Sequence, residues 1–235
     1  LETHPKPSHS SRVDAARSTR NMLTASNFWF FVILSLNFWL VPVLPYDDVG
    51  ELFTDGLLAL TLLAVIAFQG LIDKRFRLWA ILAGAVILAA ITVEEVFPTV
   101  AYIENASFAV SFAAATALYF HMMTLSLKDV TFDTVFAAAC TYILIGLFFA
   151  SIYGLIVEAD PGAFALANSM ADRYDLLYYS FATLTTLGAA DVLPASNAAK
   201  MLTVFEATMG LIYIAFLVGS VVGAFSARIA ARNES

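Results

Sequence analysis

Long apolar segments alternate with short polar loops along most of the chain. Each segment approaches the roughly 20 residues that an α-helix needs to cross a bilayer. The pattern therefore predicts an all-α membrane protein with six spanning helices. Their expected bounds are Asn27–Val43, Gly56–Ile72, Leu78–Val93, Ala106–Leu127, Val135–Val157 and Ala198–Ala227.

One shorter stretch interrupts this pattern between the last two apolar segments. Tyr174–Asp191 is partly apolar and rich in hydroxyl groups, and it is too short to cross a bilayer as a helix. We expect a half-length helix over Tyr174–Leu184, followed by non-helical backbone. Such a re-entrant element is tolerated at membrane depth only where it is buried in protein or lines a water-filled cavity. The stretch therefore indicates a pore.

The composition supports a membrane location. The chain has 235 residues, of which 60% are hydrophobic and 13% charged, whereas soluble domains are nearer half apolar and a quarter charged. The chain carries a single cysteine, Cys140, which excludes an intrachain disulfide and a cysteine-based metal site. No hydrolase motif is visible, so we expect no enzyme. A transporter with inverted repeats would show two broken helices, and only one is visible here.

The charges indicate the orientation. Of the 12 Lys and Arg residues, all but Arg173 and Lys200 lie in the N-terminal tail, two alternate loops and the C-terminal end. The loops 46–55 and 94–105 carry acids and no Lys or Arg. Because Lys and Arg accumulate on the cytoplasmic side, both termini are predicted to be cytoplasmic. We expect a multi-pass protein of the plasma or inner membrane.

Four regions are expected along the chain. Residues 1–26 form a cytoplasmic tail, 27–130 a four-helix membrane domain, 131–228 a pore domain and 229–235 a cytoplasmic end. The fourth predicted span, Ala106–Leu127, contains no Arg or Lys. Moving charge through the membrane field is what makes a channel open steeply with voltage. We therefore expect no steep voltage gating.

The segment Tyr178–Asp191 resembles the pore helix and selectivity filter of the tetrameric potassium-channel superfamily, and most of all its bacterial two-helix pore modules. Thr185, Thr186, Gly188 and Asp191 match the family pattern, and Leu187 is a conservative replacement. The resemblance extends over Val135–Ala227. It implies a homo-tetramer in the lipid bilayer, with no cofactor beyond the permeant ions and no nucleic-acid partner.

The resemblance also implies roles for single residues. Carbonyl rings from Thr186, Leu187 and Gly188 would replace the hydration shell of potassium or sodium. Tyr178 and Tyr179 would form the aromatic cuff of the pore helix, and Gly210 the gating hinge of the last helix. An acid within a span is a functional candidate, and we expect Glu206 to support the pore helix by hydrogen bonding.

Two positions depart from the family pattern. The usual filter Tyr is Ala189 and the second Gly is Ala190. Since non-Gly residues adopt positive φ at a cost, the outer half of the filter is expected to differ from that of the family. The prediction is a cation channel with weak or absent potassium selectivity. A potassium-selective channel and a non-conducting sensor or auxiliary subunit remain alternatives, and gating could depend on a regulatory domain or subunit outside this chain.

Overall fold

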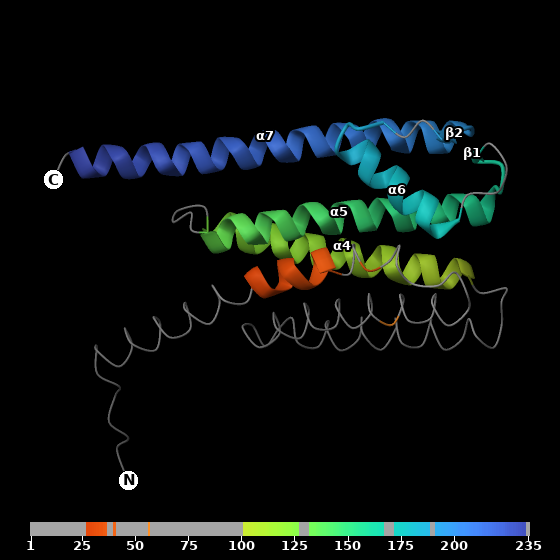
Figure 1. The fold of residues 1–235 in the computed structure, drawn as a ribbon, viewed down its shortest axis with the longest axis horizontal. Helices are drawn as coiled ribbons and strands as arrows, with labels where there is room; N and C mark the ends of the chain where they lie inside the picture. The colour runs from red at the N-terminus through yellow and green to blue at the C-terminus, as the bar shows by residue number, and fades with distance from the viewer. Residues whose placement is uncertain are drawn as a thin grey trace, which may run out of the picture.

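The computed structural model describes residues 27–36, 40, 56, 101–126, 132–166, 172–188 and 191–233. Spanning helices predicted for 56–72 and 78–93, and the tail at 1–26, lie outside these ranges except for Gly56. The described chain is mostly helical (Figure 1). Its labelled elements are α4 (Ala101–Ser126), α5 (Phe132–Ala159), β1 (Phe164–Leu166), α6 (Arg173–Leu184), β2 (Val192–Pro194) and α7 (Asn197–Asn233).

The long helices run side by side, and the short helix α6 lies between α5 and α7 (Figure 1). A first hydrophobic cluster joins the helix Asn27–Leu36 to α4 and α5 through buried residues that include Phe30, Phe108, Tyr119 and Leu144. Because these side chains come from three helices, their burial connects the described part of the predicted four-helix domain to the first helix of the predicted pore domain.

A second hydrophobic cluster surrounds α6. It contains Phe149 and Tyr153 of α5, Leu176 and Leu184 of α6, and Tyr213 of α7, among others. Because lipid is as apolar as these side chains, their packing stabilises the contact mainly through van der Waals interactions. The half-length helix is therefore held by packing against both of its long neighbours.

Two of the described helices are long and apolar enough to cross a membrane, over Thr134–Ala159 and Asn197–Ser220. They correspond to the last two predicted spans. Helix α4 has 26 residues and lies in the region of the fourth predicted span. It begins at Ala101 and not at the predicted Ala106, so residues 101–105 belong to the helix and not to the predicted loop.

The two spans differ in how much of their surface is buried by the rest of the chain. Within the most apolar window of each, 56% of the α5 residues are buried, but only 17% of the α7 residues. Large apolar side chains remain exposed along α7, including Val204, Leu211 and Val218. Such a contiguous apolar face is suited to lipid or to another protein surface.

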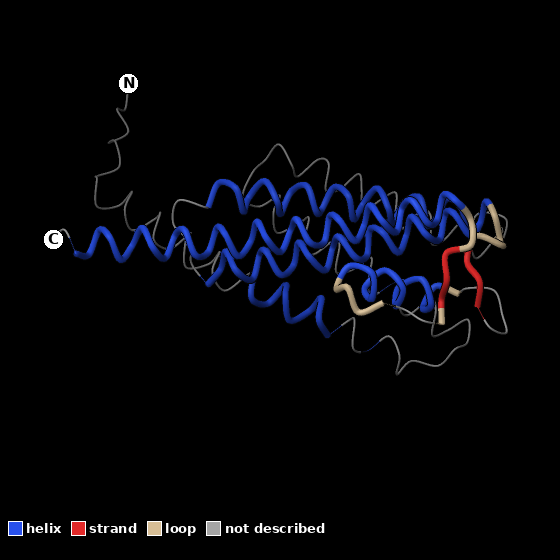
Figure 2. The backbone as a smooth tube through the Cα atoms, turned by 90° about the horizontal axis from the view of Figure 1, so that it is seen from above, coloured by secondary structure: helices blue, strands red, loops and turns tan. Residues whose placement is uncertain are grey.

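The structure adds a small sheet to the predicted all-α fold. Strands β1 and β2 pair antiparallel, with Ala165 opposite Leu193, at the end of the bundle beside α6 (Figure 2). The backbone N–H groups of Ala195 and Ser196 also donate to the Ala163 carbonyl, at 2.8 and 3.2 Å. The sequence pattern missed this sheet because three-residue strands are too short to show an alternation of apolar and polar positions.

Candidate functional site

Helix α6 begins with a capping box. The Asp172 carboxylate accepts a hydrogen bond from the Asp175 N–H at 2.8 Å, and the Asp175 carboxylate accepts one from the Asp172 N–H at 3.1 Å. Reciprocal bonds of this kind satisfy N–H groups that have no partner within the helix. The cap explains why α6 starts at Arg173, one residue before the predicted Tyr174.

This end of α6 is acidic. Partial burial raises the pKa of Asp175 above its usual value, and the nearby carboxylates of Asp172 and Asp191 raise it further, while the hydrogen bond from the Asp172 backbone acts in the opposite direction. Asp191 directly precedes β2 and is exposed. Asp172 and Asp175 lie at the start of α6, and Asp191, which follows the turn after α6, lies close enough to act on Asp175. Clustered negative charge of this kind raises the local concentration of cations.

The C-terminal end of α6 continues into a tight turn. The Thr185 N–H donates to the Phe181 carbonyl at 3.0 Å, and the Thr185 hydroxyl donates to the same carbonyl at 2.6 Å. The Thr186 N–H then donates to the Thr183 carbonyl at 3.0 Å. These bonds end the helix at the Thr-Thr pair that the sequence analysis assigned to the filter.

Two residues of this turn have left-handed backbone. Thr186 has φ 59° and Gly188 has φ 79°. Glycine adopts such angles without steric cost, but a β-branched residue does so at roughly 1–2 kcal/mol. The Gly188 N–H donates back to the Ala182 carbonyl at 3.1 Å, which helps to hold this conformation. Backbone strain of this kind is concentrated at functional sites.

The turn projects from the chain. Thr185, Thr186, Leu187 and Gly188 are all exposed, and the apolar side chain of Leu187 is 73% exposed. Ala189 and Ala190 lie outside the described residues, so their predicted effect on the filter stays a prediction. An exposed, irregular backbone after a half-length helix offers carbonyl oxygens to an ion, provided that other protein surfaces enclose it.

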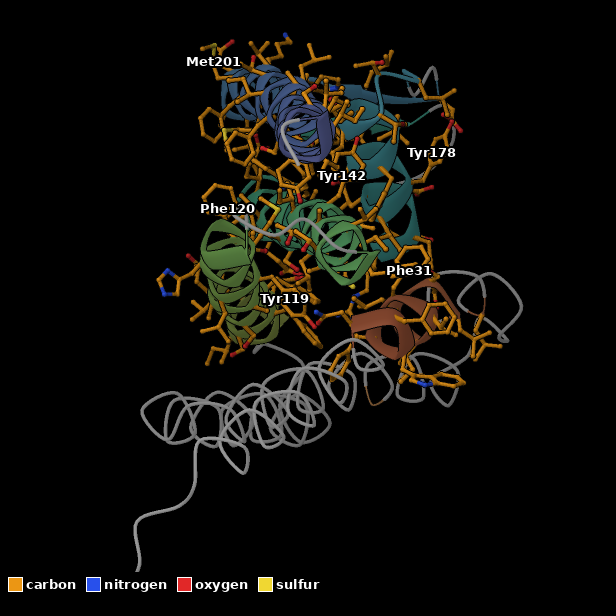
Figure 3. All side chains as sticks on the ribbon, turned by 90° about the vertical axis from the view of Figure 1, so that its left-hand side faces the viewer. Phe31, Tyr119, Phe120, Tyr142, Tyr178 and Met201 are labelled. Atoms are coloured by element: carbon orange, nitrogen blue, oxygen red, sulfur yellow. The ribbon has the colours of Figure 1, made fainter. Side chains whose placement is uncertain are left out.

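The last carbonyl of α6 lies against both neighbouring helices. The Tyr142 hydroxyl of α5 donates to the Leu184 oxygen at 2.9 Å, and Tyr142 lies between α5 and α7 (Figure 3). On the other side, a Cβ atom added to Gly210 of α7 would lie 2.7 Å from the same oxygen. Gly210, predicted as a gating hinge, is thus placed where only a glycine permits the approach of the α6 backbone.

The two tyrosines predicted as an aromatic cuff lie on different faces of α6. Tyr179 is buried, its hydroxyl is 2.7 Å from the Thr203 hydroxyl, and its ring makes edge contacts with Tyr153 and Phe164. Tyr178 is 44% exposed. Tyr153 and Phe164 were missed by the sequence analysis, because aromatic residues inside apolar segments are common and only the fold shows which of them meet.

Glu206 of α7 is completely buried behind α6. One of its carboxyl oxygens lies 2.5 Å from the Ser180 hydroxyl, and the other lies 2.5 Å from the Tyr153 hydroxyl. The structure thus brings the predicted support residue to the pore helix. Its partners Ser180 and Tyr153 were not identified from the sequence, since they are 26 and 53 residues away along the chain.

No curated protein and no solved structure matches the chain. Residues 140–227, fewer than half of the 235, match the family model described as an ion channel. The matched segment contains the larger part of α5, all of α6 with its C-terminal turn, and the larger part of α7. Residues 140–227 are therefore similar to the ion channel family, and in this segment two apolar helices flank the half-length helix and its exposed turn.

Proposed function

We propose that this protein is a channel for monovalent cations in which Thr186, Leu187 and Gly188 form the ion-binding part of the pore. The observation that carries the proposal is the left-handed backbone of Thr186 and Gly188, directly after a half-length helix in the segment that matches the ion channel family. Potassium and sodium prefer oxygen ligands, and carbonyl oxygens of such a turn can replace their hydration shell.

The proposed pore is a homo-tetramer. One turn per chain cannot enclose an ion, and the exposed Leu187 and the largely uncovered α7 offer apolar surface to further copies as well as to lipid. The acids Asp172, Asp175 and Asp191 would lie around the outer entrance and attract cations. The resemblance to potassium channels and the ion-channel family match support this arrangement.

We expect weak potassium selectivity, because Ala189 and Ala190 replace the Tyr and Gly that complete the outer filter in the potassium-channel superfamily. The test is a reversal potential in planar bilayers with potassium on one side and sodium on the other. A value near zero is expected. A strongly potassium-selective shift would contradict the prediction and favour the alternative of a selective channel, whereas absence of cation flux into liposomes would favour a non-conducting sensor or auxiliary subunit.

We also expect opening without steep voltage dependence. Helix α4 overlaps the predicted fourth span, where a voltage-gated relative would carry Lys or Arg, and it contains neither. Each elementary charge that crosses the full membrane field contributes about 2.3 kcal/mol per 100 mV, so a helix without such charges supplies little of this energy. The measurement is single-channel open probability across positive and negative potentials. An e-fold change over a few millivolts would rule out this expectation.

A further inference from the structure

The carboxyl group of Glu206 connects three helices at the back of α6. It comes from α7, and its two oxygens contact the Ser180 hydroxyl of α6 and the Tyr153 hydroxyl of α5, each at 2.5 Å. The side chain is fully buried and lies inside the apolar span Asn197–Ser220. Neither of these two partners carries a charge that could compensate an ionised carboxylate, and an uncompensated charge is strongly disfavoured in such surroundings.

The number of hydrogens available in this cluster also favours a protonated Glu206. The Ser180 oxygen lies 2.8 Å from the Gly146 carbonyl and 2.5 Å from Glu206. A hydroxyl has one hydrogen to donate, and a carbonyl can only accept. If Ser180 donates to Gly146, the hydrogen between Ser180 and Glu206 must come from the carboxyl group. An ionised Glu206 would instead leave one of the two short oxygen–oxygen contacts of Ser180 without a hydrogen.

A second set of contacts lies one helical turn further along the same three helices. Tyr142, Leu184 and Gly210 each lie four residues from Gly146, Ser180 and Glu206 respectively, and residues four apart share a helix face. In this second layer the Leu184 carbonyl receives the Tyr142 hydrogen bond and touches Gly210. The Glu206 cluster therefore lies one helical turn from the contacts that hold the C-terminal end of α6, where the proposed filter begins.

We propose that Glu206 is a protonated carboxylic acid that donates its hydrogen to Ser180, while Ser180 donates to the Gly146 carbonyl and Tyr153 donates to Glu206. In this role Glu206 is a positioning residue for the turn Thr185–Gly188. It does not contact the ion. The part of the inference that concerns the filter depends on the proposed channel function, and the protonation state does not.

Infrared spectroscopy of the full chain in lipid at neutral pH tests the protonation state directly. A protonated carboxyl group has a C=O stretch that carboxylates lack. The difference spectrum between the wild type and Glu206→Gln is expected to contain this band. In Ser180→Ala, which keeps Glu206, the band is expected to move to higher frequency because the carboxyl group loses its acceptor. A carboxylate signal in place of the band would overturn the proposal.

Bi-ionic reversal potentials test the positioning role. The Gln amide can donate to Ser180 and accept from Tyr153, so Glu206→Gln is expected to keep the wild-type permeability ratio. Ser180→Ala removes the link between Glu206 and Gly146. The permeability ratio is expected to change about fivefold, which corresponds to the free energy of one ordinary hydrogen bond. Unchanged ratios in both Ser180→Ala and Glu206→Ala would overturn the positioning role. If the wild type carries no cation current, the proposed function fails, while the infrared result still decides the protonation state.

Discussion

Gly188→Ala is expected to reduce cation flux at least about tenfold while leaving the helices folded. The φ of Gly188 is +79°, and among the described residues of one chain no atom lies within 4 Å of an added Cβ. Within one chain the cost of the substitution is therefore the left-handed conformation itself, about 1 kcal/mol or more. If four chains line one pore, the total conformational cost is about 4 kcal/mol. Every 1.4 kcal/mol corresponds to a tenfold change in the population of the conducting conformation.

The matched control is Gly219→Ala. It adds the same methyl group at a position where φ is not left-handed and no atom of the described residues lies within 4 Å. Liposome flux assays on both variants, together with circular dichroism to verify their helix content, separate a local change of the turn from general damage. Wild-type flux in Gly188→Ala would show that the working pore does not use the left-handed conformation, and the proposed role of this residue would then be wrong.

The apolar pattern predicted best the helices whose formation depends only on the length and hydropathy of their own segment. Helices α5 and α7 include the predicted Val135–Val157 and Ala198–Ala227 and extend beyond them at both ends. The half-length helix was also predicted to within one residue, and the difference is the capping box of Asp172. Length and hydropathy are properties of a segment by itself, so a membrane span can be recognised without knowledge of what surrounds it.

The candidate site was predicted less completely, because its contacts join residues that are distant in the sequence. The Thr-Thr-Leu-Gly pattern located the turn, and an acid inside a span drew attention to Glu206. The pattern could not show that Ser180 and Tyr153 meet that acid, or that Tyr179 is buried while Tyr178 is exposed. Nor could it distinguish two reasons for a glycine at position 210, a bend in the helix or a close contact with another backbone.

Gly210→Ala is expected to destabilise the protein by about 1–3 kcal/mol per chain, the usual range for an overpacked interior. The added Cβ would lie 2.7 Å from the Leu184 carbonyl oxygen and 3.0 Å from a Leu184 methyl carbon. The nearest of these atoms belongs to the backbone, so the end of α6 must shift, and with it the hydrogen bond from Tyr142.

Gly223→Ala supplies a control with the opposite expected sign. Both glycines lie within α7, but in the part of the chain that the structure describes no atom lies within 4 Å of a Cβ at Gly223. Replacing Gly by Ala in a helix interior without a clash stabilises by roughly 0.5–1 kcal/mol. Thermal unfolding in one detergent should therefore move to lower temperature for Gly210→Ala and to equal or higher temperature for Gly223→Ala. If Gly210 acted only as a gating hinge, Gly210→Ala would stiffen α7 and change gating without lowering the unfolding temperature. If Gly210→Ala unfolds at or above the wild-type temperature, the close contact with Leu184 is not what requires a glycine at this position.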